Sequence, residues 1–169
     1  MVDDYEPWRR FVSTTLRERR ELQLIAEAVD GPEAVQVAQQ LQPDLILLDI
    51  GLPTINGIEA ARRILQSAPK TKILFVSEQR SADVAEEALR TGAGGYVVKS
   101  HAATELLPAV EAVLQGKRFV SAGLTGITFT DAEQVQQLAF SNENSAKPHQ
   151  RTCSAGKTFT NPARACQCR

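Results

Sequence analysis

Long apolar runs are missing from this 169-residue chain, and none approaches the roughly 18 residues that a membrane-spanning helix needs. The amino terminus also lacks the basic segment and apolar stretch of a secretory signal, because Asp3, Asp4 and Glu6 stand there. From both absences we expect neither a membrane protein nor a secreted one. We therefore expect a cytoplasmic protein that has no contact with a membrane.

Acidic residues are missing from positions 144–169, which carry five Lys and Arg, whereas residues 1–143 carry twenty acids against fourteen Lys and Arg. Cysteine is confined to the last seventeen residues, and its odd count of three implies no closed disulfide framework. Residues 125–169 also contain only six of Leu, Ile, Val and Phe, too few to offset the entropy of ordering the chain. This composition predicts a tail that is mostly disordered, with one or two helical turns near residues 131–140.

What the chain does contain is a regular alternation of segments with helical and strand patterns. Leu45–Leu48 has four apolar residues without polar alternation, which is typical of a strand covered on both faces. Helix after strand with short connections predicts a parallel sheet between two layers of helices, an α/β fold. We expect helices at Glu6–Leu16, Ala34–Leu41, Ile58–Ser67, Val84–Leu89 and Ala102–Gln115, and strands at Leu22–Ala26, Leu45–Leu48, Ile73–Val76 and Tyr96–Val98.

Polar side chains follow these strands at the point where each one ends. They are Asp49, Ser77 and Lys99, together with the pair Asp3 and Asp4, which follow Met1 and Val2 where a fifth strand would be expected before the first helix. Taken singly, each has an ordinary explanation as a cap, a turn residue or a solvated side chain. Because the carboxyl ends of parallel strands share one edge of the sheet, their convergence favours a functional site there.

Three carboxylates within a few ångströms would repel one another by up to ~4 kcal/mol per pair at intermediate dielectric, so this site calls for a cation. Hard oxygen ligands with room for water suit Mg²⁺ best. Asp49 could then act as a nucleophile that forms an acyl phosphate. Ser77 and Lys99 would receive the phosphoryl oxygens as a hydroxyl donor and a point charge.

Four stretches together resemble the receiver domain of response regulators in two-component systems. They are Val2-Asp3-Asp4, Leu47-Leu48-Asp49-Ile50-Gly51-Leu52-Pro53-Thr54-Ile55-Asn56-Gly57, Phe75-Val76-Ser77 and Gly92-Ala93-Gly94-Gly95-Tyr96-Val97-Val98-Lys99. The resemblance covers residues 1–122. It implies a flavodoxin-like (βα)5 fold, doubly wound, with strand order 2-1-3-4-5. The first strand is truncated in this chain, because only Met1 and Val2 are left to form it.

The resemblance also implies roles for the residues at the strand ends. Asp49 would accept a phosphoryl group from a sensor histidine kinase. Asp4 and Asp49 would hold Mg²⁺ together with the backbone carbonyl of Gly51, and Asp3 would support the metal through water.

Ser77 and Tyr96 match the family's switch pair, in which the hydroxyl moves toward the phosphoryl group and the ring turns inward behind it. Without the family, Tyr96 is better explained as a packed aromatic residue of a strand.

Three functions remain open from the sequence. The first is a phosphorylation-controlled switch that acts through a protein surface, with homodimerisation through the last helices as one form of output. The second is a DNA-binding transcriptional regulator whose output domain is lost or scrambled, since residues 123–169 contain no recognisable helix-turn-helix; DNA binding is not expected without one. The third is a phosphohydrolase, but Gly51 stands where such enzymes place a general acid, so we expect no enzyme.

Overall fold

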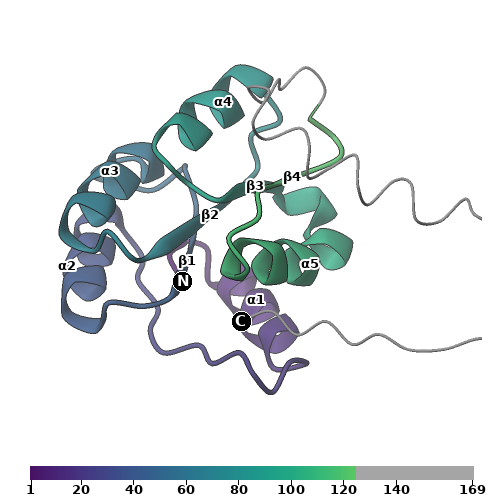
Figure 1. Cartoon of the computed structure of the whole chain (residues 1–169), viewed down its shortest axis with the longest axis horizontal. Helices are drawn as coiled ribbons and strands as arrows, with labels where there is room; N and C mark the ends of the chain where they lie inside the picture. Colours follow the sequence, from purple (N-terminus) through teal and green to yellow (C-terminus); the bar gives the residue numbers. More distant parts are fainter. Residues whose placement is uncertain (125–169) are drawn as a thin grey trace, which may run out of the picture. The chain divides into compact units, whose positions relative to one another are not determined.

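The computed structural model describes residues 1–124, and all elements named below lie within them (Figure 1). Two helices come first, and strands and helices then alternate. The bounds are α1 Glu6–Leu16, α2 Gly31–Leu41, β1 Leu45–Leu48, α3 Gly57–Ser67, β2 Lys72–Ser77, α4 Ala82–Arg90, β3 Gly95–Val98, the 3₁₀ turn η1 Lys99–His101, α5 Ala102–Leu114 and β4 Phe119–Val120.

The starts of two helices show why the chain folds as its local sequence predicts. At α2, the Asp30 side chain accepts a hydrogen bond from the backbone N–H of Glu33 at 2.9 Å. At α3, the Asn56 side chain does the same for the backbone N–H of Glu59, also at 2.9 Å. Each cap satisfies a backbone donor that has no partner inside its helix. The Asn56 cap also fixes the end of the loop that follows β1.

The sheet is parallel, with β1, β2, β3 and β4 side by side in that order. Val2 adds parallel bridges to Leu48 on one side and to Ala28 on the other. The Met1–Val2 stub therefore lies between β1 and the segment that ends at Ala28. Counting the stub and that segment as first and second strands makes β1, β2 and β3 the third to fifth, which gives the predicted order 2-1-3-4-5 with the first strand truncated; β4 adds a sixth strand beside β3. The flavodoxin-like α/β fold is confirmed.

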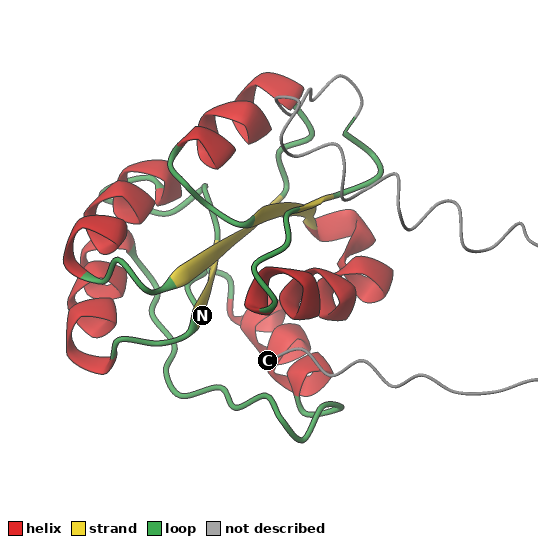
Figure 2. Cartoon of the chain, viewed as in Figure 1, coloured by secondary structure: helices red, strands yellow, loops and turns green. Residues whose placement is uncertain are grey.

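Helices cover both faces of the sheet (Figures 1 and 2). α1 and α5 lie on one face, where Leu16 and Val110 belong to a buried core that also contains Leu47 and Leu74 of the sheet. α2, α3 and α4 lie on the other face. Because both faces are covered, the sheet can present functional side chains only at its edges and ends.

Two strand predictions differ from the structure. The segment Leu22–Ala26 was expected to be a strand, but it forms none, although its side chains alternate between partly buried and exposed as expected. The reason is that the truncated first strand offers it no ladder beyond Met1 and Val2. Conversely, the sequence did not predict β4, because two residues give no strand pattern. Phe119 and Val120 form a strand through parallel pairing with Gly95 and Tyr96.

Residues 125–169 lie outside the described part of the chain. The expectations of a mostly disordered tail, of helical turns near residues 131–140 and of a missing output domain concern these residues and stay predictions. The boundary placed between residues 122 and 123 is likewise a prediction.

Candidate functional site: an acidic pocket at the strand ends

Backbone ladder bonds place two of the predicted acids side by side. The N–H of Val2 donates to the carbonyl of Leu47 at 2.8 Å, and the N–H of Asp49 donates to the carbonyl of Val2 at 3.0 Å. Asp3 therefore follows the stub at the same edge where Asp49 follows β1. Even a two-residue strand is enough to set this register.

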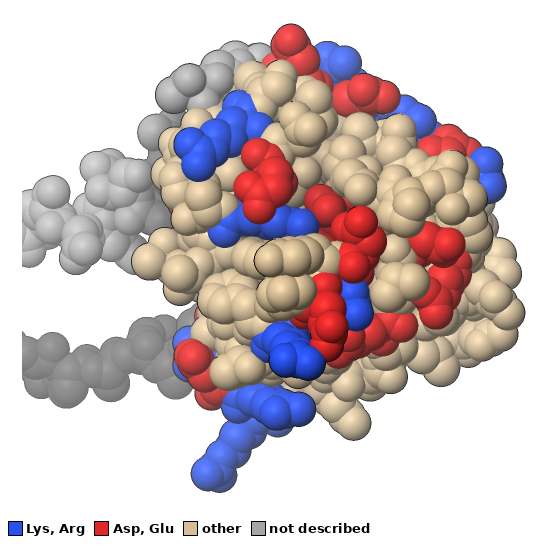
Figure 3. Space-filling view, turned by 180° about the vertical axis from the view of Figure 1, so that it is seen from behind, with Lys and Arg blue, Asp and Glu red and all other residues tan. Residues whose placement is uncertain are grey.

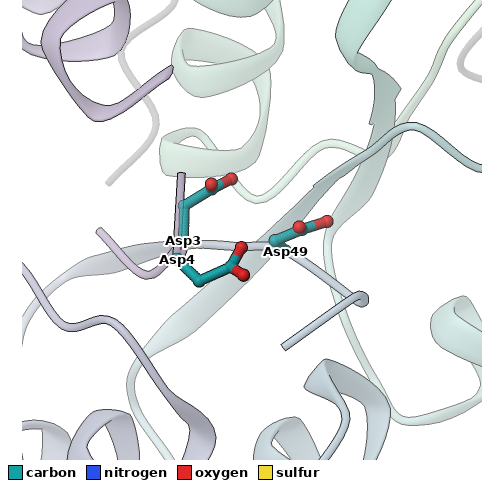
Figure 4. Close-up of side chains that lie close together, drawn as sticks. All are labelled: Asp3, Asp4 and Asp49. Carbon is teal, nitrogen blue, oxygen red and sulfur yellow. The ribbon is translucent and has the colours of Figure 1, made fainter. Parts of the chain in front are cut away.

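Three carboxylates gather at this edge. Asp3, Asp4 and Asp49 each offer an oxygen, and these oxygens lie within 4.8 Å of one another (Figure 4). Asp3 and Asp49 are buried, whereas Asp4 is exposed. The Asp3 side chain also accepts a hydrogen bond from the backbone N–H of Tyr5 at 3.0 Å, and Asp49 Oδ1 accepts one from the N–H of Ile50 at 2.8 Å. These bonds fix the directions of both buried carboxylates.

Lys99, the residue after β3, brings a cation between the buried acids. Its ammonium lies 2.6 Å from Asp3 Oδ2 and 3.1 Å from Asp49 Oδ2. Burial disfavours the charged ammonium, but the two carboxylates outweigh burial and raise the pKa of Lys99. Burial also raises the pKa of Asp3, although Lys99 opposes it. The site thus holds a close ion triad, one cation shared by two anions.

The donor set fits a magnesium ion. The single ammonium of Lys99 cannot neutralise three carboxylates, so the pocket keeps excess negative charge that a divalent cation would neutralise. All of the acidic donors are oxygen, the ligand type that Mg²⁺ prefers, and Asp4 is open to water. A side-chain Cβ built on Gly51 would stand 3.6 Å from Asp49 Oδ2, so residue 51 also borders the pocket. The Gly51 carbonyl as a ligand stays a prediction.

Gly57 controls how closely the loop after β1 packs against α3. A Cβ at this position would lie 1.9 Å from the Asp49 carbonyl oxygen, well inside any real contact distance. The Gly57 N–H also donates to the carbonyl of Ile50 at 2.9 Å. Only glycine lets the start of α3 approach the backbone of the pocket in this way.

Ser77 and Tyr96 are connected through one backbone residue, Gln79. The N–H of Gln79 donates to the Ser77 hydroxyl at 3.3 Å, and the Tyr96 hydroxyl donates to the Gln79 carbonyl at 3.0 Å. The Tyr96 side chain is fully buried against Phe75. Burial raises the pKa of the Tyr96 hydroxyl, and the Asp49 charge adds to this effect. The ring is thus turned inward, and its hydroxyl remains within electrostatic reach of Asp49.

Sequence reasoning missed three contributors to the site. Trp8 places its ring 5.3 Å from the Lys99 ammonium, and Arg9 donates from its guanidinium to the Asp3 carbonyl at 2.9 Å. Gln79 acts only through its main chain. Trp8 and Arg9 lie on the first helix, whose periodicity marks a core-facing stripe but not which residues reach the pocket. No pattern in the sequence could have identified Gln79.

The fold and the pocket together define a doubly wound α/β domain with a cluster of acidic side chains at its strand ends. The family model described as "Response regulator receiver domain" matches residues 1–111. The chain belongs to this family, the phosphorylation-controlled receiver domains of two-component response regulators.

Two curated relatives and one solved structure show how far the similarity extends. The chain is 34% identical over 125 residues to the transcriptional regulatory protein DegU of Brevibacillus brevis, covering 74% of this chain and 53% of the relative. It is 34% identical over 143 residues to LnrK of Bacillus subtilis strain 168, another transcriptional regulatory protein, covering 85% and 65%. A LuxR-family two-component response regulator from Aurantimonas sp. SI85-9A1 superposes with a TM-score of 0.71 at 32% identity, covering 82% and 94%.

The chain therefore spans between half and two thirds of these two curated relatives. Both relatives are named as transcriptional regulators. Because this chain matches only part of each, the activity of the whole relative is not assigned to this chain. Among residues 1–124 no helix has the length and apolar character that crossing a membrane would require.

Proposed function

We propose that Asp49 accepts a phosphoryl group from a sensor histidine kinase and that this modification switches the surface of the domain. The observation that carries the proposal is the meeting of Asp3, Asp4, Asp49 and Lys99 at one end of the sheet. In the transfer, an Asp49 carboxylate oxygen attacks phosphorus, and the bond from phosphorus to the donor's imidazole nitrogen breaks. The electron pair stays with the imidazole, which takes up a proton.

Asp4 and Asp49 would hold Mg²⁺ together with the backbone carbonyl of Gly51, and Asp3 would support the ion through water. When bound, the ion would supply charge neutralisation for the phosphoryl oxygens. Lys99 has a matching role: as the Asp49 charge is consumed by the new bond, its ammonium becomes available to the phosphoryl group. The two ion-pair distances support this role, since Lys99 already lies within reach of the accepting side chain.

Ser77 and Tyr96 would carry the change away from the pocket. The Ser77 hydroxyl accepts the Gln79 N–H and so keeps its own proton free to donate to a phosphoryl oxygen. A shift of Ser77 would move Gln79, and the carbonyl of Gln79 holds the Tyr96 hydroxyl. The main chain of Gln79 is therefore a direct link from the pocket to the ring of Tyr96.

The proposal is tested by treating the full chain with acetyl phosphate and Mg²⁺ and measuring its intact mass. We expect one added phosphoryl group in the unaltered chain and none in Asp49→Asn. Asp44→Asn is the matched control, because Asp44 is an exposed acid at the opposite end of the same strand, and it should be modified as fully as the unaltered chain. Modification of Asp49→Asn to the same extent would overturn the assignment of Asp49.

A second candidate function is transcriptional regulation through DNA, favoured by the names of the relatives. On the face shown in Figure 3, acidic and basic side chains are intermixed, so this face offers no broad basic area for a phosphate backbone. Salt-sensitive binding of the full chain to duplex DNA would favour this candidate.

Homodimerisation through α4 and α5, the last helices, stays a prediction that sedimentation velocity can check.

A further inference from the structure

Arg9 of α1 is held between the acidic pocket and the segment that precedes α2. Its Nη1 donates to the backbone carbonyl of Asp3 at 2.9 Å, and its Nε pairs with Glu27 Oε2 at 3.0 Å. The Arg9 side chain is only 15% exposed. A guanidinium can make both contacts at once, because its donors form a rigid planar fork. Arg9 therefore has a fixed position beside the pocket.

Asp4 is the least restrained of the three acids in the pocket. The Asp3 and Asp49 carboxylates each accept a hydrogen bond from a backbone N–H. Within residues 1–124, by contrast, no hydrogen bond or ion pair holds the exposed Asp4 side chain. Its carboxylate nevertheless points toward Asp49 (Figure 4). The direction of this side chain must therefore be set by the backbone from which it projects.

The backbone on both sides of Asp4 is fixed by hydrogen bonds. The carbonyl that Arg9 contacts belongs to the peptide unit joining Asp3 to Asp4, and a peptide unit is planar. The next unit, which joins Asp4 to Tyr5, is held by the Tyr5 N–H, which donates to the Asp3 side chain at 3.0 Å. Fixing both planes fixes φ and ψ of Asp4 and with them the direction of its Cα–Cβ bond. Arg9 supplies one of these two restraints.

We propose that Arg9 is a positioning residue, which aims the Asp4 carboxylate at the divalent-cation site by fixing the Asp3–Asp4 peptide unit. This inference rests on the proposed function in one respect, the role of Asp4 as a ligand of the ion. Arg9 itself contacts neither the ion nor the phosphoryl group. Its effect is preorganisation, because a carboxylate that already points into the site loses less freedom when the ion binds.

The charge of Arg9 predicts an effect of the opposite sign. Arg9 brings a positive charge next to a pocket in which three acids face a single lysine. By Coulomb's law alone, removing that positive charge would tighten the binding of a cation. Loss of positioning would weaken the binding instead. The direction of the change therefore distinguishes the two effects.

The test titrates the full chain with Mn²⁺ and follows the electron paramagnetic resonance signal of the free ion, since carboxylate sites that suit Mg²⁺ also suit Mn²⁺. Arg9→Met should weaken binding by about tenfold, as loss of a partner that orients a metal ligand typically does. Arg9→Lys keeps the charge but not the fork, and should weaken binding by about threefold or more. Arg10→Met is the matched control: Arg10 is the next residue, is 79% exposed and pairs with Glu6. It should bind within about twofold of the unaltered chain, because solvent and salt screen an exposed charge.

A double-mutant cycle shows whether Arg9 acts through Asp4. In an Asp4→Asn background, Arg9→Met should weaken Mn²⁺ binding by less than about twofold further, because the side chain that Arg9 aims has already been changed. Unchanged or tighter binding by Arg9→Met, or the same loss in the Asp4→Asn background, would overturn the proposal. If Arg9→Met does not fold, as urea unfolding would show, Arg9→Lys carries the test, and its binding within about twofold of the unaltered chain would overturn the proposal. Absence of Mn²⁺ binding by the unaltered chain would overturn the cation site itself, whereas phosphorylation of Asp49 is read separately from the intact mass.

Discussion

Replacing Lys99 with methionine would remove the one cation that lies between the two buried acids. Lys99 contacts both Asp3 and Asp49, and its side chain is only 7% exposed. Removing one partner of a buried ion pair costs about 3–5 kcal/mol, because it leaves buried charge without compensation. The repulsion that Lys99 screens is of similar size, at least about 3.5 kcal/mol for two carboxylate oxygens no more than 4.8 Å apart at intermediate dielectric. We expect Lys99→Met to lower the free energy of unfolding by this amount near neutral pH.

The loss should depend on pH in a defined direction. Burial already raises the pKa of Asp3, and without Lys99 the folded-state pKa rises further above its unfolded value. A carboxyl with a raised folded pKa binds protons more readily in the folded state, so stability falls as pH rises between the unfolded and folded pKa values. The deficit of Lys99→Met is therefore largest well above the folded pKa of Asp3 and shrinks as the solution is acidified.

Urea unfolding followed by far-ultraviolet circular dichroism, at about pH 8 and about pH 5, measures this deficit. Lys72→Met is the matched control, since the Lys72 ammonium donates to the Leu114 carbonyl at 2.6 Å and pairs with no acid in the ion pairs of residues 1–124. Its cost should be about 1.5–3 kcal/mol and nearly the same at both pH values. A Lys99→Met deficit below about 1 kcal/mol, or one that does not change with pH, would refute the reasoning.

Two further substitutions test the backbone around the pocket and the switch residue. Gly57→Ala should cost about 1–3 kcal/mol in urea unfolding, because its Cβ would collide with the Asp49 carbonyl; Gly51→Ala meets only an ordinary contact and should cost less. Equal costs would contradict this packing argument. Tyr96→Phe removes a hydroxyl that donates to a backbone carbonyl, so we expect a loss of about 1 kcal/mol in the same assay. An unchanged unfolding midpoint would show that the hydroxyl contributes nothing to folding.

Most of the fold was predictable because its signals are local. Leu45–Leu48 has the predicted bounds, since four apolar residues end at polar and turn-forming neighbours. Leu22–Ala26 has an equally clear alternation but forms no strand, because a ladder needs a partner and the partner is nearly absent. Phe119–Val120 shows the reverse case: these two residues form a strand because they pair with Gly95 and Tyr96 of β3, and a two-residue segment has no sequence pattern that predicts a strand.

The location of the site was predictable from the sequence, but the contacts between its side chains were less so. The rule that parallel strands end at one edge was sufficient to bring Asp3, Asp49 and Lys99 together. It could not tell that Lys99 would pair with Asp3 as closely as with Asp49, nor that Asp4 would remain exposed. Such distinctions depend on side-chain geometry set by packing, which periodicity does not encode.

The contact between Trp8 and Lys99 has a practical consequence, because Trp8 is the chain's single tryptophan. Indole emission responds to charge beside the ring, so the light emitted by the whole protein originates next to the pocket's cation. Occupancy of the pocket by an ion or a phosphoryl mimic would then be readable in real time, without dyes or labels. The fluorescence of Trp8 is thus an intrinsic probe of this pocket.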